Sequence, residues 1–333
     1  MPDPGLDLLC IGNAIVDVLS HADEAFLRDE GLSKGTMALI DEARAEVLFA
    51  RTGAATIVSG GSAANTAVGA AALGARAGFA GKVRDDELGR LFAHDLRATG
   101  VAYGTPLAQD GPATARCFVL VTPDGERTMN TYLGACQDLG PGDLDEAEVA
   151  SARIVYLEGY LWDPPAAKDA FRAAVRIAHG AGNRVALSLS DPFCVDRYRG
   201  EFRTLLQDGS LDILFANLAE LKSLYETADE EAALSALRQE GVLGVVTRSE
   251  AGALVVSRDG TEAVPAMLVE RVLDTTGAGD LFAAGFLAGL VQNLSGGDCA
   301  RLGALAAAEV IGHLGARPQT DLGALARNEG LLP

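Results

Sequence analysis

The sequence predicts an α/β protein in which a mostly parallel central sheet lies between two layers of helices, with a small β-sheet lid added. Short apolar runs alternate with longer amphipathic segments along most of the chain, an order typical of parallel strands joined by helices. Of the 333 residues, 49% are hydrophobic, 5% are aromatic and 39 are glycine, which suits close packing of small aliphatic side chains. A chain of this length buries a full α/β core, so we expect one domain over residues 1–333.

The expected elements follow one another in β-α order. The strand-like runs are LDLLCIGNAIVDV, ARAGFAG, RIVYLEGY, RVALSLSD, DILFANLAEL, LGVVTRS and ALVVSRDG. Helices are expected near residues 62–74, 86–99, 164–182, 280–293 and 298–313. This recurrence of β-α units carries no sequence repeat of fixed period.

Two segments interrupt the alternation and predict a lid. Residues 33–41 and 113–133 resemble antiparallel strands, and the second forms a hairpin around Pro123, Asp124 and Gly125, which are typical turn residues. We expect the lid to comprise about 14–41 and 112–134 and to stand over the carboxyl edge of the main sheet, where open α/β sheets bind ligands. Lids of this kind exclude water during group transfer.

The charge of the chain excludes two classes of partner. With 27 Lys and Arg against 46 Asp and Glu, the formal net charge is −19, and such a field repels nucleic acid and anionic membranes. A solvated acidic surface explains most of this charge. An anionic substrate would therefore need a local positive site built from backbone N–H groups, a few basic side chains and a metal ion.

Cysteine usage and the first residues predict a cytoplasmic protein. The five cysteines are widely spaced, odd in number and without a C-x-x-C pair, which indicates free thiols and neither a disulfide framework nor a zinc site. The opening MPDPGLDLLC carries acids where a signal peptide needs bases. No apolar run reaches the ~20 residues that cross a bilayer.

The strongest local motif is RVLDTTGAGDLFAAGF, where a glycine-rich turn enters a helix. The N–H groups of Gly277, Ala278 and Gly279 and the positive end of the helix dipole can form an anion hole. The next residue, Asp280, can accept a proton from an attacking hydroxyl while a phosphoryl group rests on those donors. Taken alone, GAGD favours the simpler interpretation of Asp280 as a helix-start acid worth about 1 kcal/mol, since such turns begin many helices.

Two common nucleotide motifs are absent from the sequence. A dinucleotide fingerprint that begins at Gly277 would need glycine or alanine where Phe282 stands. A phosphate-binding P-loop would need Ser or Thr after Gly81 and Lys82, but Val83 follows. The sequence therefore favours neither a nicotinamide dehydrogenase nor a P-loop kinase.

These residues resemble the ribokinase-like, or PfkB, carbohydrate and nucleoside kinases. GGSAANTAVGAAALGARAGFAGKVRDDELG is similar to the N-terminal family signature and DTTGAGDLFAAGF to the C-terminal one; the GNAIVD opening and an N-x-x-E element at Asn217 to Glu220 also fit. The resemblance covers nearly the whole chain and implies a three-layer ribokinase-like fold, ATP and Mg²⁺ as cofactors, and Asp280 as the catalytic base. Within the family, ERTMNTYLGACQDL, SLSDPF and DILFANLAEL are most similar to adenosine kinases. This implies transfer to the 5′-hydroxymethyl group of a nucleoside, with adenosine favoured.

The resemblance also assigns the acceptor site. A ribose diol would be bound by a carboxylate, amides and closely approaching backbone at Asn13, Asp17, Gly61 and Asn65. An apolar slot for the base would be lined by Ile15, Met37, Met129, Thr131, Leu133 and Phe193. Tight turns, helix starts and core packing are the structural explanations of the same residues.

For the nucleotide, the resemblance points to Asn217 and Glu220, with Glu220 arranging Mg²⁺ through water. Further nucleotide contacts are implied at Thr247, Arg248, Gly252, Ala304 and Ala308, with His313 nearby and Ser249 standing where the family loop has glycine. Arg127 would reach the transferred phosphate with its forked donors. A monovalent-cation loop, for K⁺, is implied at Asp274, Thr276, Val310 and Gly315.

Several alternatives remain open at the level of sequence. The acceptor could be a sugar such as ribose, fructose or a keto-deoxy sugar acid, with the same fold and mechanism. A nucleoside- or sugar-binding regulator without catalysis is a second alternative, although the intact GAGD favours an enzyme. The chain could act as a monomer or a homodimer.

Overall fold

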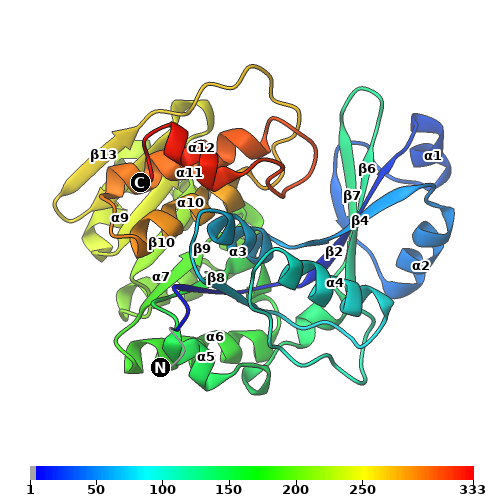
Figure 1. The fold of residues 1–333 in the computed structure, drawn as a ribbon, viewed down its shortest axis with the longest axis horizontal. Helices are drawn as coiled ribbons and strands as arrows, with labels where there is room; N and C mark the ends of the chain where they lie inside the picture. Colours follow the sequence, from blue (N-terminus) through cyan, green and yellow to red (C-terminus); the bar gives the residue numbers. More distant parts are fainter. Residues whose placement is uncertain (1–4) are drawn as a thin grey trace.

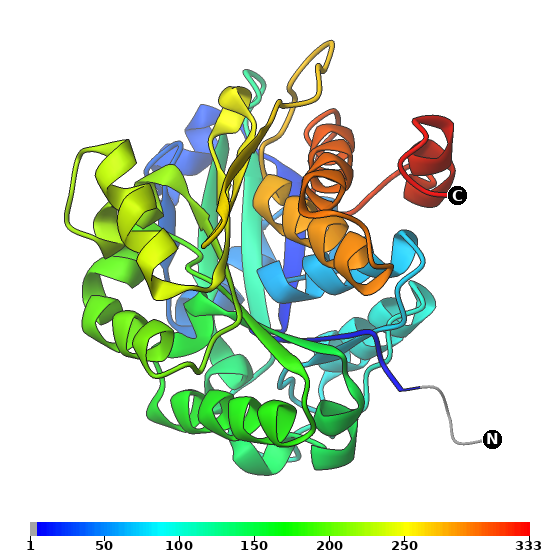
Figure 2. The ribbon, with the colours of Figure 1, turned by 90° about the vertical axis from the view of Figure 1, so that its left-hand side faces the viewer.

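The computed structural model describes residues 5–333, which contain a central sheet of eight strands (Figures 1 and 2). In spatial order the strands are β13 (Gly260–Val264), β12 (Ala253–Ser257), β11 (Leu243–Thr247), β10 (Ile213–Asn217), β9 (Arg184–Ser188), β8 (Ile154–Glu158), β1 (Leu8–Ile11) and β5 (Ala77–Ala80). All pairs from β11 to β5 are parallel, whereas β12 and β13 are added antiparallel at one edge. The predicted fold class is therefore confirmed.

Helices cover both faces of this sheet because its strands are apolar on both sides. Leu8 and Cys10 of β1 belong to one buried apolar cluster, and Leu9 and Ile11 belong to another, as the two-residue period of a strand requires. The first cluster includes residues of α3 (Ser62–Ala72), α4 (Glu87–Ala98), α10 (Ala278–Val291), α11 (Gly296–Val310) and α12 (Leu322–Asn328). The second includes residues of α5 (Glu146–Ser151), α6 (Pro165–Gly180), α7 (Pro192–Gln207), α8 (Leu218–Leu224) and α9 (Glu230–Glu240).

The five helices predicted from the sequence correspond to α3, α4, α6, α10 and α11. Their observed ends lie within a few residues of the predicted ones. Local chemistry explains several starts: the Asp86 carboxylate caps α4 by accepting from the Gly89 amide at 2.8 Å, and Pro165 occupies the first position of α6. Among the described residues, no helix is both long and apolar enough to cross a membrane.

A second sheet of five strands stands beside the large one (Figure 1). Its spatial order is β3 (Met37–Leu39), β7 (Arg127–Tyr132), β6 (Ala115–Val121), β2 (Ile15–His21) and β4 (Ala55–Gly60). The predicted hairpin is confirmed by the antiparallel pair of β6 and β7. The expectation that residues 33–41 form an antiparallel strand was wrong: only β3 forms there, and it runs parallel to β7. A tight turn forces antiparallel pairing only on strands adjacent in sequence. The sequence also did not predict β4 as a strand.

The two faces of the small sheet have different surroundings. On one face, Val18, Phe118 and Tyr132 pack against Ala45 and Leu48 of α2 (Glu42–Arg51), which lies with α1 (Glu24–Asp29) on the outer side in Figure 1. The strand register places Asp17, Cys117, Thr131 and Leu39 in one row on the opposite face. Arg127 belongs to that face too and binds residues of the large unit, so this face is turned toward the helices of the large sheet.

Candidate active site

The glycine-rich turn begins α10 as predicted. Gly277 is the N-cap with φ of +80°, and a Cβ there would lie 2.6 Å from the Cβ of Ala316, so both conformation and space demand glycine. The Ala278 amide donates to the Thr275 carbonyl at 3.2 Å. In the described part of the chain, the Gly277 and Gly279 amides donate to no protein atom, and Gly279 is exposed. Two of the three predicted donors are therefore free to meet an anion.

Asp280 lies in the first turn of α10 and faces α3. Its carboxylate accepts from Ser62 Oγ at 2.6 Å and from Asn65 Nδ2 at 2.8 Å. Burial raises the pKa of Asp280, while the two hydrogen bonds and the charge of Arg317 act in the opposite direction. The sequence brought Asp280 and Asn65 to one site but missed Ser62, whose only signal was its place beside the paired glycines.

The side chain of Asn65 makes a hydrogen bond through Nδ2, whereas its Oδ1 has no hydrogen-bond partner among the described residues. It is buried, and its Oδ1 accepts no hydrogen bond although its Nδ2 is committed to Asp280. A buried carbonyl oxygen without a donor costs about 1–3 kcal/mol, so it marks a place where a ligand donor would be stabilising. A hydroxyl of an acceptor molecule would meet this need.

Asn13, a predicted ribose ligand, has both polar atoms of its side chain engaged within the protein. Its Nδ2 donates to Glu158 Oε1 at 2.7 Å, and its Oδ1 accepts from the Cys136 thiol at 3.0 Å. Glu158 Oε2 also accepts from the Ala63 amide at 2.8 Å, and burial raises the pKa of Glu158 to about 7. Glu158 was missed by the sequence because an acid at the end of a strand has no motif. It fixes Asn13 and the start of α3.

Asp17 lies against the turn that carries the predicted Gly61. A Cβ on Gly60 would come within 2.3 Å of Asp17 Oδ2, and one on Gly61 within 2.2 Å of the Asn13 carbonyl oxygen. Gly61 has a φ of +95°, which only glycine adopts easily. Burial raises the pKa of Asp17 to about 7, the positive charge of Arg317 lowers it and the charge of Asp280 raises it further. Asp17 and Asp280 therefore act on each other's ionisation.

The predicted base slot is apolar but not closed. Ile15 and Met129 pack with Cys117, Val119 and Val121 on the site-facing side of the small sheet. Thr131 shares that face and donates to the Cys117 sulfur at 3.2 Å, and Leu133 is half-buried just after β7. Met37 is 53% exposed and Phe193 is 79% exposed, so these two are available to a ligand and are not packed in the core.

Tyr160 is a third residue that the sequence missed, after Ser62 and Glu158. It lies in the short 3₁₀ turn Gly159–Trp162 after β8 and is 41% exposed. Burial raises the pKa of its hydroxyl, and the charges of Asp191, Asp280, Glu220 and Glu158 raise it further. Acids from four separate segments of the chain therefore act on this one hydroxyl.

Arg127 connects the small sheet to the loop before the glycine turn. Its guanidinium contacts the Asp274 carboxylate and donates to Thr276 Oγ1. Asp274 in turn accepts from the Thr276 amide at 2.6 Å and the Gly315 amide at 2.8 Å. Because this carboxylate is fully engaged, a monovalent cation at the predicted loop of Asp274, Thr276, Val310 and Gly315 would have to use backbone carbonyl oxygens.

Asn217 and Glu220 form a reciprocal cap at the start of α8. The Glu220 amide donates to Asn217 Oδ1 at 2.9 Å, and Glu220 Oε2 accepts from the Asn217 amide at 2.9 Å. Glu220 Oε1 accepts from Asn217 Nδ2 at 2.6 Å, and burial raises the pKa of Glu220 to about 7. Both oxygens have partners, which fits contact with a hydrated Mg²⁺ through water better than direct ligation. No cluster of three or more His, Cys, Asp or Glu suited to a metal occurs within residues 5–333.

The loop after β11 contains Ser249, which stands where the resembled family has glycine. Ser249 has a φ of +51°, a conformation that favours glycine, so the loop keeps its shape with a strained serine. Gly252, at φ of +82°, could not carry a side chain, because its Cβ would lie 2.1 Å from the Val264 carbonyl oxygen. Thr247 ends β11, and Arg248 pairs with Glu230 at 3.2 Å.

The last predicted nucleotide residues lie on α11 or just after it. Ala304 is buried and Ala308 is half-buried. His313 follows the helix and approaches Glu309 at 3.3 Å and the Leu314 carbonyl at 3.2 Å. These contacts give His313 a structural role at the end of α11.

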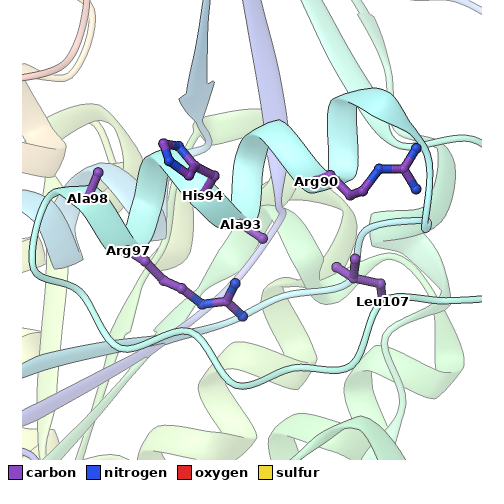
Figure 3. Close-up of a pocket in the computed structure, with 6 residues that line it drawn as sticks. All are labelled: Arg90, Ala93, His94, Arg97, Ala98 and Leu107. Atoms are coloured by element: carbon purple, nitrogen blue, oxygen red, sulfur yellow. The ribbon is translucent and has the colours of Figure 1, made fainter.

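A separate hollow lies on α4 (Figure 3). It has a volume of about 380 Å³ and is lined by Arg90, Ala93, His94, Arg97, Ala98 and Leu107. Arg90 is paired with Asp85, and Arg97 donates to the Tyr103 carbonyl, so these side chains are already engaged. None of the candidate active-site residues lines this hollow.

The chain is similar to known proteins over most of its length. Residues 36–321 match the model of the pfkB family carbohydrate kinases. An ATP-dependent ribose-1-phosphate kinase from Halopiger xanaduensis is 35% identical over 231 residues, which cover 69% of this chain and 72% of that protein. A solved probable sugar kinase from Rhizobium etli CFN 42 has a TM-score of 0.92 at 50% identity, covering 99% of this chain and 100% of that one. A solved adenosine kinase from Sinorhizobium meliloti has a TM-score of 0.90 at 52% identity, covering 97% and 99%.

Proposed function

We propose a reaction from one premise: the chain belongs to the pfkB family of carbohydrate kinases. It is a kinase of sugars or nucleosides, and we propose that it transfers the γ-phosphoryl group of ATP to the 5′-hydroxyl of a nucleoside, most favourably adenosine. The products would be the nucleoside monophosphate and ADP. The observation that carries this proposal is that Asp280, in the first turn of α10, follows two glycines, Gly277 and Gly279, whose amides donate to no described protein atom.

A residue of the site can be proposed for each step of the transfer. The Gly277 and Gly279 amides and the dipole of α10 would hold the oxygens of the transferred group, where negative charge develops. Asp280 would accept the proton of the attacking hydroxyl. Ser62 and Asn65 hold the carboxylate toward α3 and restrict its rotation. Arg127 would neutralise charge at the same turn once it leaves Asp274.

Mg²⁺ would supply charge neutralisation at the ATP phosphates, and the residues fit it through water. Asn217 donates a hydrogen bond to each carboxylate oxygen of Glu220, which fixes the orientation of the carboxylate. Because both oxygens already accept a hydrogen bond, contact with Mg²⁺ through water suits them better than direct ligation. Thr247 ends the neighbouring strand β11, which is paired with β10, and Arg248 follows it. These residues would orient the phosphates of the nucleotide.

A nucleoside acceptor is favoured by the two halves of the site. The free Oδ1 of Asn65 and the Asp17 carboxylate suit the hydroxyls of a ribose. Ile15, Met129 and the exposed Phe193 and Met37 offer an apolar surface to a planar base. The likeness to the adenosine kinase from Sinorhizobium meliloti supports the same choice.

A sugar acceptor is the second candidate. It is favoured by the 50% identity to the probable sugar kinase from Rhizobium etli CFN 42 and by the ribose-1-phosphate kinase relative. The polar part of the site would serve a sugar equally well. Only the apolar part distinguishes the two acceptors.

One assay tests both candidates. ADP release is measured with ATP, Mg²⁺ and a panel of adenosine, inosine, guanosine, ribose, fructose, ribose 1-phosphate and a keto-deoxy sugar acid, with and without K⁺. We expect the highest kcat/KM with adenosine. Turnover of a sugar with none of adenosine would reject the nucleoside assignment, and no turnover of any acceptor would favour a binding protein without catalysis.

A further inference from the structure

Arg317 lies in the segment after α11 and reaches the junction between β4 and α3. Its Nε and Nη2 donate to the Ser59 carbonyl at 3.1 and 2.9 Å, and Nη2 also donates to Ser59 Oγ at 3.0 Å. Its Nη1 donates to the Ala64 carbonyl at 3.0 Å. All of these acceptors are uncharged. These hydrogen bonds hold the guanidinium in place, but none of their acceptors is a carboxylate that would neutralise its charge.

Carboxylates face this guanidinium at longer range. Burial lowers the pKa of Arg317 to about 10, and the charges of Asp17, Asp95 and Asp280 oppose that effect. Asp95 is close to the same junction, since its Oδ2 accepts from the Ser59 amide at 2.8 Å. An arginine with no contacting acid is costly to bury. Its position among acids indicates that its charge has a use.

A short series of contacts connects Arg317 to Asp280. Arg317 Nη1 donates to the Ala64 carbonyl, and the next residue, Asn65, donates from Nδ2 to the Asp280 carboxylate at 2.8 Å. Two other acids near it, Asp17 and Glu158, have a pKa raised to about 7 by burial, and the charge of Asp280 raises both further. Asp280 also raises the pKa of the Tyr156 and Tyr160 hydroxyls, after the larger effect of burial. In the part of the chain that the structure describes, Arg317 is the cation that acts on both Asp17 and Asp280.

Other cations do not take this role. Arg127, on the side of the glycine turn, is engaged by Asp274 and Thr276. On the side of α3, the groups that contact Asp280 are the neutral Ser62 and Asn65. A crowded set of acids without a cation would take up protons, because like charges in a poorly solvated site disfavour ionisation.

We propose that Arg317 is a positioning residue whose fixed charge keeps the Asp280 carboxylate ionised at neutral pH, while its forked hydrogen bonds hold Ser59 and Ala64 at the ends of β4 and α3. The proposal rests on the proposed function, in which Asp280 must be ionised to accept a proton. Arginine suits the role because its planar fork is rigid and its charge persists at all accessible pH.

The pH profile of kcat/KM tests the role of the charge. Removing a cation near a carboxylate makes that carboxylate easier to protonate, so Arg317→Gln moves the acidic limb to higher pH by about one unit, with turnover recovered above the limb. Arg317→Lys retains the charge and leaves the limb near that of the wild type. Ser59→Ala removes one hydrogen bond without a charge and leaves the limb unmoved. If Arg317→Gln lowers kcat/KM by the same factor at every pH, without moving the acidic limb, the proposal is overturned.

A second measurement does not depend on turnover. The side-chain carboxyl carbon of Asp280, assigned by comparison with Asp280→Asn, is titrated by ¹³C NMR in the full-length protein. We expect a higher midpoint in Arg317→Gln than in the wild type, and an unchanged midpoint overturns the proposal. If the midpoint moves but the wild type phosphorylates no acceptor, the proposed function fails and the role of Arg317 stands. If Arg317→Gln does not fold, a midpoint near that of the wild type in Arg317→Lys supports the proposal, and a rise of about one unit contradicts it.

Discussion

The carboxylate of Asp280 and the side-chain amide of Asn65 are joined by a hydrogen bond of 2.8 Å across 215 residues of sequence. One belongs to the first turn of α10 and the other to the first turn of α3. The two helices pack against each other on one face of the large sheet, with Leu281 and Ala284 close to Gly69. The packing of two apolar helices thus sets the position of the proposed base.

Asp280→Asn tests the proposed base directly. Asparagine has nearly the same shape but cannot accept the proton, so we expect kcat to fall by about 100- to 10,000-fold. Calorimetry should show that the acceptor still binds, since the ribose and base contacts are elsewhere. Turnover within a few fold of the wild type would remove Asp280 from the mechanism.

Arg127→Ala tests the link between the small sheet and the glycine turn. The Arg127 and Asp274 side chains are 15% and 1% exposed, and removing the arginine leaves the buried carboxylate without its cation. We expect the free energy of unfolding to fall by about 3 kcal/mol, and kcat to fall more than KM rises. Arg28→Ala is the matched control, because Arg28 and its partner Asp29 are both 74% exposed and such pairs contribute about 0–1 kcal/mol. Equal effects of the two substitutions on stability and turnover would contradict this role.

Gly61→Ala tests the backbone at the end of β4. Its φ of +95° and the 2.2 Å approach of an added Cβ to the Asn13 carbonyl oxygen predict strain and displacement of Asn13. We expect the free energy of unfolding to fall by at least about 2 kcal/mol and KM for the acceptor to rise. Gly53→Ala is the control, since an added Cβ there has no heavy atom within 4 Å. A stable Gly61→Ala protein with unchanged KM would show that this turn does not serve the acceptor.

The buried acids predict an unusual dependence of stability on pH. The pKa values of Asp17, Glu158 and Glu220 are raised to about 7 in the folded protein, in each case mainly by burial. The folded state therefore holds more protons than the unfolded state between about pH 4 and 7. Over this window the free energy of unfolding should fall as pH rises, by at most about 4 kcal/mol for Asp17 and about 3 kcal/mol for each of the two glutamates.

Denaturant unfolding at a series of pH values measures this slope. Glu158→Gln removes one of the titrating groups and should reduce the slope between pH 4 and 7, whatever its effect on absolute stability. Asp110→Asn is a suitable control because Asp110 is exposed. A slope that is the same in Glu158→Gln and the wild type would show that Glu158 does not titrate in this window.

The sequence predicted the glycine turn, the five helices and the N-x-x-E element at Asn217 and Glu220, because neighbouring residues determine each of them; that Asn217 and Glu220 cap α8 came from the structure. It did not predict Ser62, Glu158, Tyr160 or Arg317, because their roles arise where segments far apart in the sequence meet. Strand β3 was assigned the wrong direction for a related reason. Its partner β7 lies about ninety residues further on, and pairing at that separation depends on the assembled sheet.

The conformation of Ser249 illustrates a limit of motif comparison. The serine that stands in place of the family glycine has a φ of +51°, in the left-handed region that favours glycine. Such a conformation costs a residue with a side chain about 1–2 kcal/mol. The residue type differs from the motif, but the backbone conformation is still one that glycine would adopt easily.

The chain passes between the two sheets four times: after β1, before α3, before β6 and after β7. Asn13, Gly61 and Leu133 occupy three of these passages, while the glycine turn that would bind phosphate belongs wholly to the large unit. In the proposed reaction, the part of the acceptor site on the small sheet would thus lie apart from the turn that binds phosphate. Substitutions on the small sheet could redirect such an enzyme from one alcohol to another while its phosphate chemistry stays intact, which would let one scaffold serve kinases of different sugars and nucleosides.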